Sequence, residues 1–178
     1  MKFVNHTLSL FFFIICCAGA NAQSTDPEFR NGWLLNAKLT NGVITDFKGS
    51  SADLYAGGVS VNPQFTVAEN VLRIGVNAGA VYGNKKVSGM VGPMAAIKLK
   101  TFTAAEFGSV ANMHLILEGN WGTNRQQIAG GGFGFEILKL AHIGITAQRD
   151  YHLNSWWLQS FIAIRLNRIK YSGDDYSR

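Results

Sequence analysis

The strongest constraint on this fold is a pair of alternating runs between Asp53 and Tyr82, joined at the short polar turn Val67-Ala68-Glu69-Asn70. In the second run, apolar side chains occupy every other position from Leu72 to Tyr82, and Arg73, Gly75, Asn77 and Gly79 occupy the opposite parity. A period of two is typical of a β-strand that has one apolar and one polar face. The two runs therefore predict paired strands rather than helices.

The first 22 residues have the pattern of an export signal. Lys2 precedes an apolar run over residues 8–17, and the small triplet Ala20-Asn21-Ala22 predicts cleavage before Gln23. The run is shorter than the roughly 20 residues that a membrane helix needs. Both cysteines lie within it, so we expect no thiol or disulfide in the mature chain. A lipoprotein signal is disfavoured, because Ile15 rather than a small residue precedes Cys16.

The remaining sequence narrows the class of protein. Residues 23–171 suit one domain, and residues 172–178 are expected to form a short periplasmic tail. The 16 basic and 11 acidic residues include no basic run of the kind that binds nucleic acid. No stretch after Ala22 is apolar for the length of a membrane helix. An exported chain of alternating strands thus predicts an all-β, antiparallel, up-and-down transmembrane β-barrel in the outer membrane of a Gram-negative cell.

The alternation predicts about eight strands, the smallest common number for such barrels. We expect them at about residues 33–41, 52–66, 72–82, 87–101, 112–121 and 156–170, with two more around 130–137 and 142–148. Pro63 is tolerated in a strand only beside an irregularity or a turn. Residues 102–111 are long for a periplasmic turn and predict a bulge or a short helix.

An even strand number places both chain ends in the periplasm and the turns at 83–86 and 122–125 outside, together with 40–51 and 149–155. Aromatic residues would then form an outer girdle and an inner girdle at the membrane surfaces. The outer set is Tyr82, Trp121, Tyr151, Trp156 and Trp157, and the inner set is Trp33, Phe65, Phe102 and Tyr171. The alternative is a soluble sandwich or lipocalin-like barrel, whose strands also alternate.

Charged residues on the inward parity predict a filled lumen. Glu118, Glu136 and two histidines on neighbouring strands would suit a metal or acid–base site. However, eight strands enclose a lumen that side chains just fill, and buried charges need partners. We therefore predict an ion-pair network, without metal or cofactor, in which the two glutamates pair with Arg165, Lys38 or Lys98. The network residues are Lys38, Arg73, Lys98, His114, Glu118, Glu136 and Arg165. Gly130, Gly132 and Gly134 would make room for long basic side chains, or would ease the curvature of the strand.

The outer rim offers two further candidates. Lys85, Lys86, Arg125 and Arg149 would lie beside lipopolysaccharide phosphates, which ammonium and guanidinium groups bind well, unless they are simply solvated turn charges. Asp150, His152 and Ser155 are a weaker candidate for catalysis. Lipid A deacylases place His and Ser two residues apart on one strand face, and the spacing here differs.

Residues 62–75, Asn-Pro-Gln-Phe-Thr-Val-Ala-Glu-Asn-Val-Leu-Arg-Ile-Gly, give the chain a resemblance to a known family. With the Gly-rich strands around them, they resemble the small outer-membrane β-barrel proteins of Bacteroidetes, and a similar rhythm covers the mature chain. Such barrels often end on an aromatic residue, whereas this chain continues beyond Tyr171.

The sequence favours a non-enzymatic structural or interaction protein with a plugged lumen. It would be an accessory subunit of a larger envelope complex or would contact outer-membrane lipid and lipopolysaccharide. A narrow channel or porin is the main alternative, and a lipid A-modifying enzyme is a weaker one.

Overall fold

The computed structural model describes residues 32–45, 54–83, 85–104, 108–137 and 140–167. The predicted signal peptide 1–22, Tyr171 and the tail 172–178 lie outside the described residues, as do residues 46–51 of the predicted outer segment 40–51.

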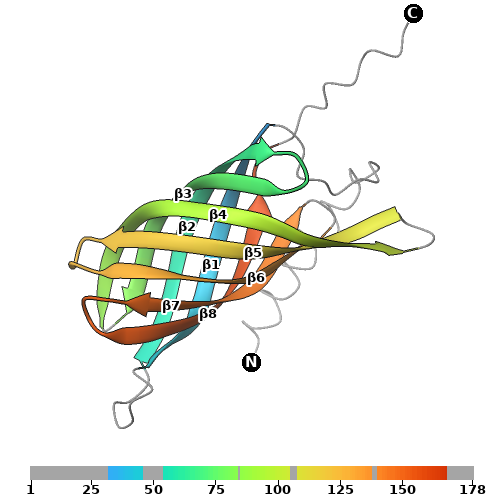
Figure 1. Cartoon of the computed structure of the whole chain (residues 1–178). Helices are drawn as coiled ribbons and strands as arrows, with labels where there is room; N and C mark the ends of the chain where they lie inside the picture. Colours follow the sequence, from blue (N-terminus) through green and yellow to red (C-terminus); the bar gives the residue numbers. More distant parts are fainter. Residues whose placement is uncertain (1–31, 46–53, 84, 105–107, 138–139, 168–178) are drawn as a thin grey trace, which may run out of the picture.

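The described residues form eight strands (Figure 1). They are β1 (Trp33–Thr45), β2 (Leu54–Ala68), β3 (Leu72–Gly83), β4 (Lys86–Ala104), β5 (Gly108–Gly122), β6 (Gln127–Ile137), β7 (Ala141–Asp150) and β8 (Ser155–Arg165). Each predicted strand is present. The last one is shorter than expected, because it ends at Arg165 rather than near Lys170.

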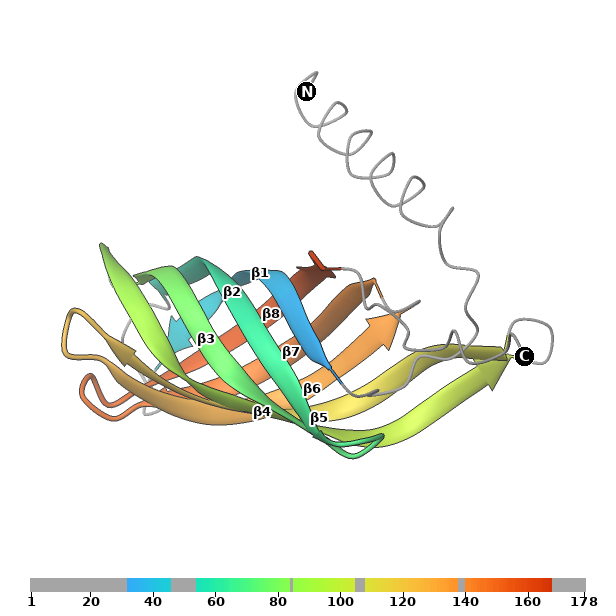
Figure 2. The ribbon, with the colours of Figure 1, turned by 90° about the horizontal axis from the view of Figure 1, so that it is seen from above.

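Every strand pairs antiparallel with its neighbour in sequence, and β8 returns to pair with β1, which closes the sheet into a barrel. The seam is continuous from Asn36 opposite Arg165 to Thr45 opposite Trp156. Figure 2 shows the strands following one another around the barrel. The predicted eight-stranded up-and-down barrel is confirmed.

The barrel has two ends, which we call end A and end B. End A carries the connections β3–β4, β5–β6 and β7–β8, and end B is where β1 begins and β8 ends. The β4–β5 hairpin extends beyond the other strands at end B (Figures 1 and 2). Where a bulge or helix was predicted over 102–111, β4 continues to Ala104 and β5 starts at Gly108, with register shifts at Lys98/Lys100 and Phe102/Thr103.

Proline and bulge positions have local explanations. Pro63 lies inside β2. The β2–β3 pairing is interrupted at this point, between the pairs Val61–Ala78 and Gln64–Gly75. Proline lacks the N–H that a ladder needs, so it is accommodated where the pairing is interrupted. The shift at Leu99 changes the parity of β4, so that Lys100 pairs with the outward residue Met113.

The barrel is polar inside and apolar outside. Lys38, Arg73 and Glu136 are at most 7% exposed, whereas Leu39, Val59 and Ile145 are at least 55% exposed. This confirms the parity predicted for the strands and is the reverse of a soluble barrel, which buries its apolar side chains. Hydrocarbon is the solvent that suits such a surface, so the fold is that of a transmembrane β-barrel. Among the described residues there is no helix that is long and apolar enough to cross a membrane.

One aromatic prediction is wrong. Trp157 was assigned to the outer girdle, but only 1% of its surface is exposed and it points into the lumen. Its neighbour Trp156 is directly opposite Thr45 and follows the outward parity of Leu158. Two adjacent strand residues face opposite sides of the sheet, so only one of the tandem tryptophans can belong to a girdle.

Candidate functional site

The lumen at end A is closed by an apolar cluster. Its buried members are Ile44, Ala56, Val81, Ile128 and Trp157, and Met90 packs against them. Gly83 makes the cluster possible, since a Cβ at this position would lie 2.7 Å from the Trp157 ring and 2.8 Å from Ile44. We call this group the end A plug.

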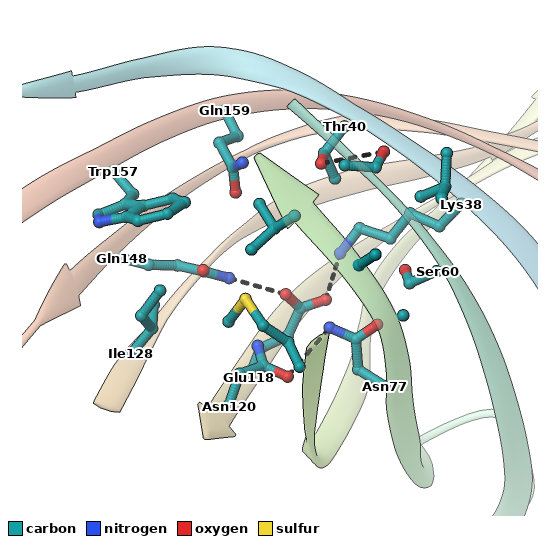
Figure 3. Close-up of a pocket in the computed structure, with 16 residues that line it drawn as sticks. Lys38, Thr40, Ser60, Asn77, Glu118, Asn120, Ile128, Gln148, Trp157 and Gln159 are labelled. Atoms are coloured by element: carbon teal, nitrogen blue, oxygen red, sulfur yellow. Dashed lines mark hydrogen bonds and ion pairs between the residues drawn. The ribbon is translucent and has the colours of Figure 1, made fainter. Parts of the chain in front are cut away.

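Below the plug, a buried ion pair crosses the lumen. The Lys38 ammonium donates to the Glu118 carboxylate, and the Gln148 amide donates to the second oxygen of that carboxylate at 2.7 Å. In Figure 3, Lys38 and Gln148 approach Glu118 from different strands. Both carboxylate oxygens therefore have a donor, as a buried charge requires.

Asparagine side chains form a second bridge at this level. The Asn62 amide donates to Asn77 at 2.7 Å, and the Asn77 amide donates to Asn120 at 3.0 Å, which links β2, β3 and β5. Next to these polar groups, Met94, Ile116 and Phe161 form a smaller apolar cluster. The Lys38 ammonium lies 4.9 Å from the centre of the Phe161 ring.

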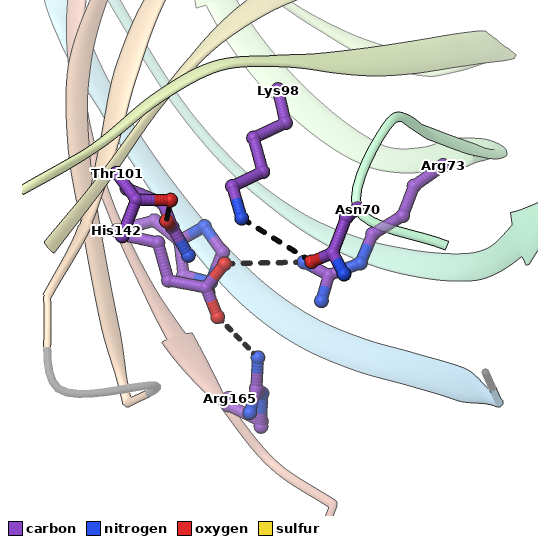
Figure 4. Close-up of polar contacts among 8 residues, drawn as sticks. Asn70, Arg73, Lys98, Thr101, His142 and Arg165 are labelled. Atoms are coloured by element: carbon purple, nitrogen blue, oxygen red, sulfur yellow. Dashed lines mark hydrogen bonds and ion pairs between the residues drawn. The ribbon is translucent and has the colours of Figure 1, made fainter. Parts of the chain in front are cut away.

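Towards end B, a second carboxylate holds two guanidinium groups. Glu136 is fully buried, Arg73 donates to one of its oxygens at 3.2 Å, and Arg165 donates to the other (Figure 4). The same carboxylate lies 3.8 Å from the Nε2 atom of His142, whose ring meets that of His114 edge-on at 5.7 Å. We call these five residues the end B cluster.

The structure brings together most of the predicted network, but not all of it. Lys38, Arg73, Glu118, Glu136 and Arg165 form ion pairs, and His114 lies beside them. Lys98 differs, because its ammonium donates to the Asn70 side chain at 3.2 Å near the end B surface (Figure 4). Of the pairings predicted for the two glutamates, the structure contains Lys38 with Glu118 and Arg165 with Glu136.

The predicted glycine stripe has two roles. Gly134 makes room for His114, because a Cβ there would lie 2.7 Å from its Nε2 atom. At Gly130 and Gly132 an added Cβ would instead meet the backbone of β7, at 2.2 and 1.9 Å. These two glycines permit close curvature of the sheet rather than providing space for long basic side chains.

Little empty space remains between these layers. One cavity of about 40 Å³ lies between the end A plug and the Lys38–Glu118 pair, and a second of about 20 Å³ lies nearer end B. Each has room for only a few water molecules at most. Within the described ranges, no group of three or more His, Cys, Asp or Glu residues is arranged to hold a metal ion.

The Asp150, His152 and Ser155 candidate has a structural explanation. One Asp150 carboxylate oxygen accepts hydrogen bonds from the backbone N–H groups of His152 and Leu153, at 2.9 and 3.1 Å. Such a bond pattern stabilises a turn. Ser155 lies directly opposite Asp150 in the β7–β8 ladder, while His152 is an exposed turn residue.

The four predicted rim cations all lie at end A. Lys85 and Arg125 occupy turns with positive φ, at 59° and 62°. Lys86 begins β4, and Arg149 stacks over Trp156 at 5.5 Å and donates to Asn154. Among the described residues of this end, the one carboxylate is Asp150, which is fully buried. The exposed formal charge of the described part of end A is therefore entirely positive.

The residues missed from sequence are mostly uncharged. Trp157, Gln148 and the three bridging asparagines complete the lumen, and all share the inward parity of their strands. Parity alone could have placed them inside, but their partners depend on the register around the closed barrel.

Neither a protein-family model nor a curated protein matches this chain. The solved structures that are similar to it include two designed proteins. One is described as "De novo design of transmembrane beta-barrels", with 13% identity over 75% of this chain and 95% of that chain, and a TM-score of 0.47. The other, "Solution NMR structure of de novo designed TMB2.3", has 15% identity over 76% of this chain and 95% of that chain, also with a TM-score of 0.47. The fold assignment rests on the strand pairings themselves.

Proposed function

We propose that this protein is a non-enzymatic outer-membrane β-barrel whose lumen is filled by side chains, and that it acts through contact with lipopolysaccharide or as an accessory subunit of an envelope complex. The observation that supports this proposal best is the layered lumen, whose two cavities measure only about 40 and 20 Å³. Solute passage needs a continuous water path, which the end A plug and the Lys38–Glu118 pair interrupt. The Bacteroidetes-type resemblance agrees with this location.

The charge of end A supports the lipopolysaccharide contact. Non-glycine residues with positive φ are uncommon, and asparagine or glycine occupies such positions at lower steric cost. Lys85 and Arg125 nevertheless occupy positions with positive φ. Together with Lys86 and Arg149, they present ammonium and guanidinium groups to the outside. Phosphate groups on the lipid surface are the ligands that such groups bind well.

A narrow channel is the second candidate. Both lumen cavities border Lys38 and Glu118, so a rearrangement of this one pair would join them. Planar-bilayer recordings of the purified protein separate the two functions. We expect no steady conductance, and stable ion-selective openings in the parent protein would make the channel the leading function.

Lipid contact is tested with purified protein in nanodiscs that contain lipopolysaccharide. Lys85→Ser combined with Arg125→Ser should reduce the amount of lipopolysaccharide that stays bound to the protein during extraction. A higher salt concentration should also reduce this amount, because salt screens the attraction between the cations and the phosphates. The matched control is Lys98→Ser with Lys100→Ser, which removes two cations from end B. Equal losses in both variants would argue against a specific contact at end A.

Orientation needs its own experiment, because it decides which lipid end A meets. Cysteine introduced at Asn124, in the β5–β6 turn, should react with an impermeant thiol reagent on intact cells. Cysteine at Val71, an exposed residue of the β2–β3 turn, should react only after the outer membrane is opened. Labelling of Val71→Cys alone on intact cells would reverse the proposed orientation.

A further inference from the structure

The outer surface of β8, β1, β2 and β3 carries an apolar groove of about 640 Å³, far larger than either lumen cavity. It exists because alanine replaces larger residues on this face. Ala37 lies directly between Ile164 and Val61, and Ala78 is opposite Val61. The side chains that form the groove include Ala37, Leu39, Val61, Ala78, Ala80 and Ile164.

Polar groups lie beside this groove, on its end A side. Asn41 follows Leu39 on the same outward parity, is exposed, and is directly opposite both Gly57 and Ser160. The Ser160 hydroxyl donates to the Asn41 carbonyl at 3.1 Å. Tyr55 folds over Gly57, since a Cβ there would lie 2.4 Å from its hydroxyl oxygen. We call Asn41, Tyr55 and Ser160 the polar shelf.

The shelf interrupts an otherwise apolar surface. Val43, Leu158 and Leu39 flank it along β1 and β8 on the same outward face. Polar side chains that face lipid are unfavourable unless they meet a hydrogen-bond partner, and they often mark functional positions. The Asn41 amide can donate to a carbonyl oxygen, and the Tyr55 hydroxyl can do the same. The ligand that fits is a hydrocarbon chain with a carbonyl group near one end.

The depth of the shelf indicates the leaflet. Thr45 and Trp156 mark the end A edge of the seam, four residues from Asn41. With the usual rise and strand tilt, four residues correspond to roughly 10 Å along the membrane normal. The shelf therefore lies in the end A half of the barrel, and the groove, which begins at Leu39, lies further from end A. A lipid whose headgroup is at end A would present its chain in this direction.

We propose that the groove and the polar shelf bind one acyl chain of lipid A, the acylated and phosphorylated part of lipopolysaccharide. The chain occupies the groove, and its ester or amide carbonyl accepts a hydrogen bond from the Asn41 amide. Lipid A is favoured over a phospholipid because the exposed charges described at end A are all positive and suit a headgroup with several phosphates. This inference rests on the proposed contact between lipopolysaccharide and end A.

The test compares the lipid retained by the protein after release from nanodiscs, measured by native mass spectrometry. The nanodiscs contain phosphatidylcholine with either lipid A or phosphatidylglycerol at equal mole fraction. Ala78→Phe should fill the groove and lower lipid A retention about tenfold, as the loss of contact for roughly two methylene groups would. The matched control, Ala95→Phe, adds the same ring to an outward position of β4, between Ile74 and Leu117 and away from both the groove and the shelf, and should retain lipid A as the parent does.

The shelf has a separate variant. Asn41→Leu keeps a side chain of similar size and removes the amide, so it should also reduce lipid A retention while leaving the heat-modifiable mobility of the folded barrel unchanged. An unfolded variant would be recognised by that mobility shift, in which case Asn41→Val and Ala78→Leu replace the two substitutions.

Three results would overturn the inference. The first is equal lipid A retention by Ala78→Phe and the parent, and the second is equal retention of phosphatidylglycerol and lipid A by the parent. The third is a dimer mass that disappears in Ala78→Phe, since a second copy would then occupy the groove. The Lys85→Ser, Arg125→Ser variant separates the two proposals. If it loses lipid A while Ala78→Phe does not, the rim contact stands and the groove assignment fails.

Discussion

The two ends of the lumen are closed by different physical means. The end A plug consists of apolar side chains that fit around Trp157, whereas the end B cluster consists of two guanidinium groups and two imidazoles around one carboxylate. The plug is stabilised by close packing, so it depends on the volume of its side chains. The cluster is stabilised by ion pairs, so it depends on the presence of each charged partner. The same barrel therefore offers two kinds of closure that respond differently to substitution.

The largest expected effect is at the centre of the end B cluster. Glu136→Ala leaves Arg73 and Arg165 buried without their shared carboxylate, and breaking a buried pair in this way costs about 3 to 5 kcal/mol. The temperature at which the heat-modifiable barrel unfolds in detergent should fall accordingly. Adding Arg165→Met should restore part of the loss, because the two sites are coupled. Purely additive effects would show that Arg165 and Glu136 are not partners.

The plug should respond almost as strongly, but through lost volume. Trp157→Ala removes the largest side chain of the cluster, and such truncations cost about 3 to 5 kcal/mol, with the lower values where neighbours can collapse into the space. Met90 packs against the cluster and is available to fill part of it. Urea unfolding in detergent measures the change. An unchanged midpoint would mean that Trp157 contributes little to closure.

The middle pair provides the next comparison. Glu118→Ala should destabilise the barrel by less than Glu136→Ala, since it removes a carboxylate that one buried cation contacts rather than two. Lys38→Met in the same chain should recover part of that loss, while Arg165→Met should not. Recovery by Arg165→Met instead would contradict the pairing seen in the lumen.

A smaller effect tests the fit of the plug from the other direction. Gly83→Ala places a methyl group against Trp157 and Ile44, and overpacking of this kind costs about 1 to 3 kcal/mol. The control is Gly119→Ala, where an added Cβ meets nothing within 4 Å. Equal melting temperatures for the two variants would indicate that the plug is loosely packed.

The smallest effect is expected at Lys98, which was predicted to join the network. Its ammonium contacts Asn70 near the surface rather than a buried carboxylate, so Lys98→Ala should change stability by no more than about 0.5 kcal/mol. Detergent melting curves are sufficient to measure it. A loss comparable to that of Glu118→Ala would return Lys98 to the ion-pair network.

The sequence predicted which side chains of each strand face the lumen better than it predicted which of those side chains contact one another. Alternation from Leu72 to Tyr82 is a local property, so parity could be read directly and proved correct. Partners depend on the register around the closed barrel, which alternation does not contain. Glu118 therefore had three possible cations in the sequence, and only the register places Lys38 against it.

Two errors have local causes. Trp157 was grouped with Trp156 because both are aromatic, although strand geometry requires adjacent residues to face opposite sides. The sequence also did not reveal the register shift at Leu99, which turns Lys100 outward, because a bulge of this kind leaves no clear mark in a stretch of alternating apolar and basic residues.

The seam between β1 and β8 has a consequence for how the chain folds. It joins residues as distant as Asn36 and Arg165, so the ring is completed only after the last strand is available. Contacts between such distant positions are slow to form, because a long loop must close before any of them is gained. The Lys38–Glu118 pair joins positions 80 residues apart, whereas Arg165 and Glu136 are 29 residues apart, so we expect the pair from β1 to β5 to form later than the pair from β8 to β6. Until the ring closes, the edges of β1 and β8 carry unpaired backbone N–H and C=O groups, which are open to pairing with another strand.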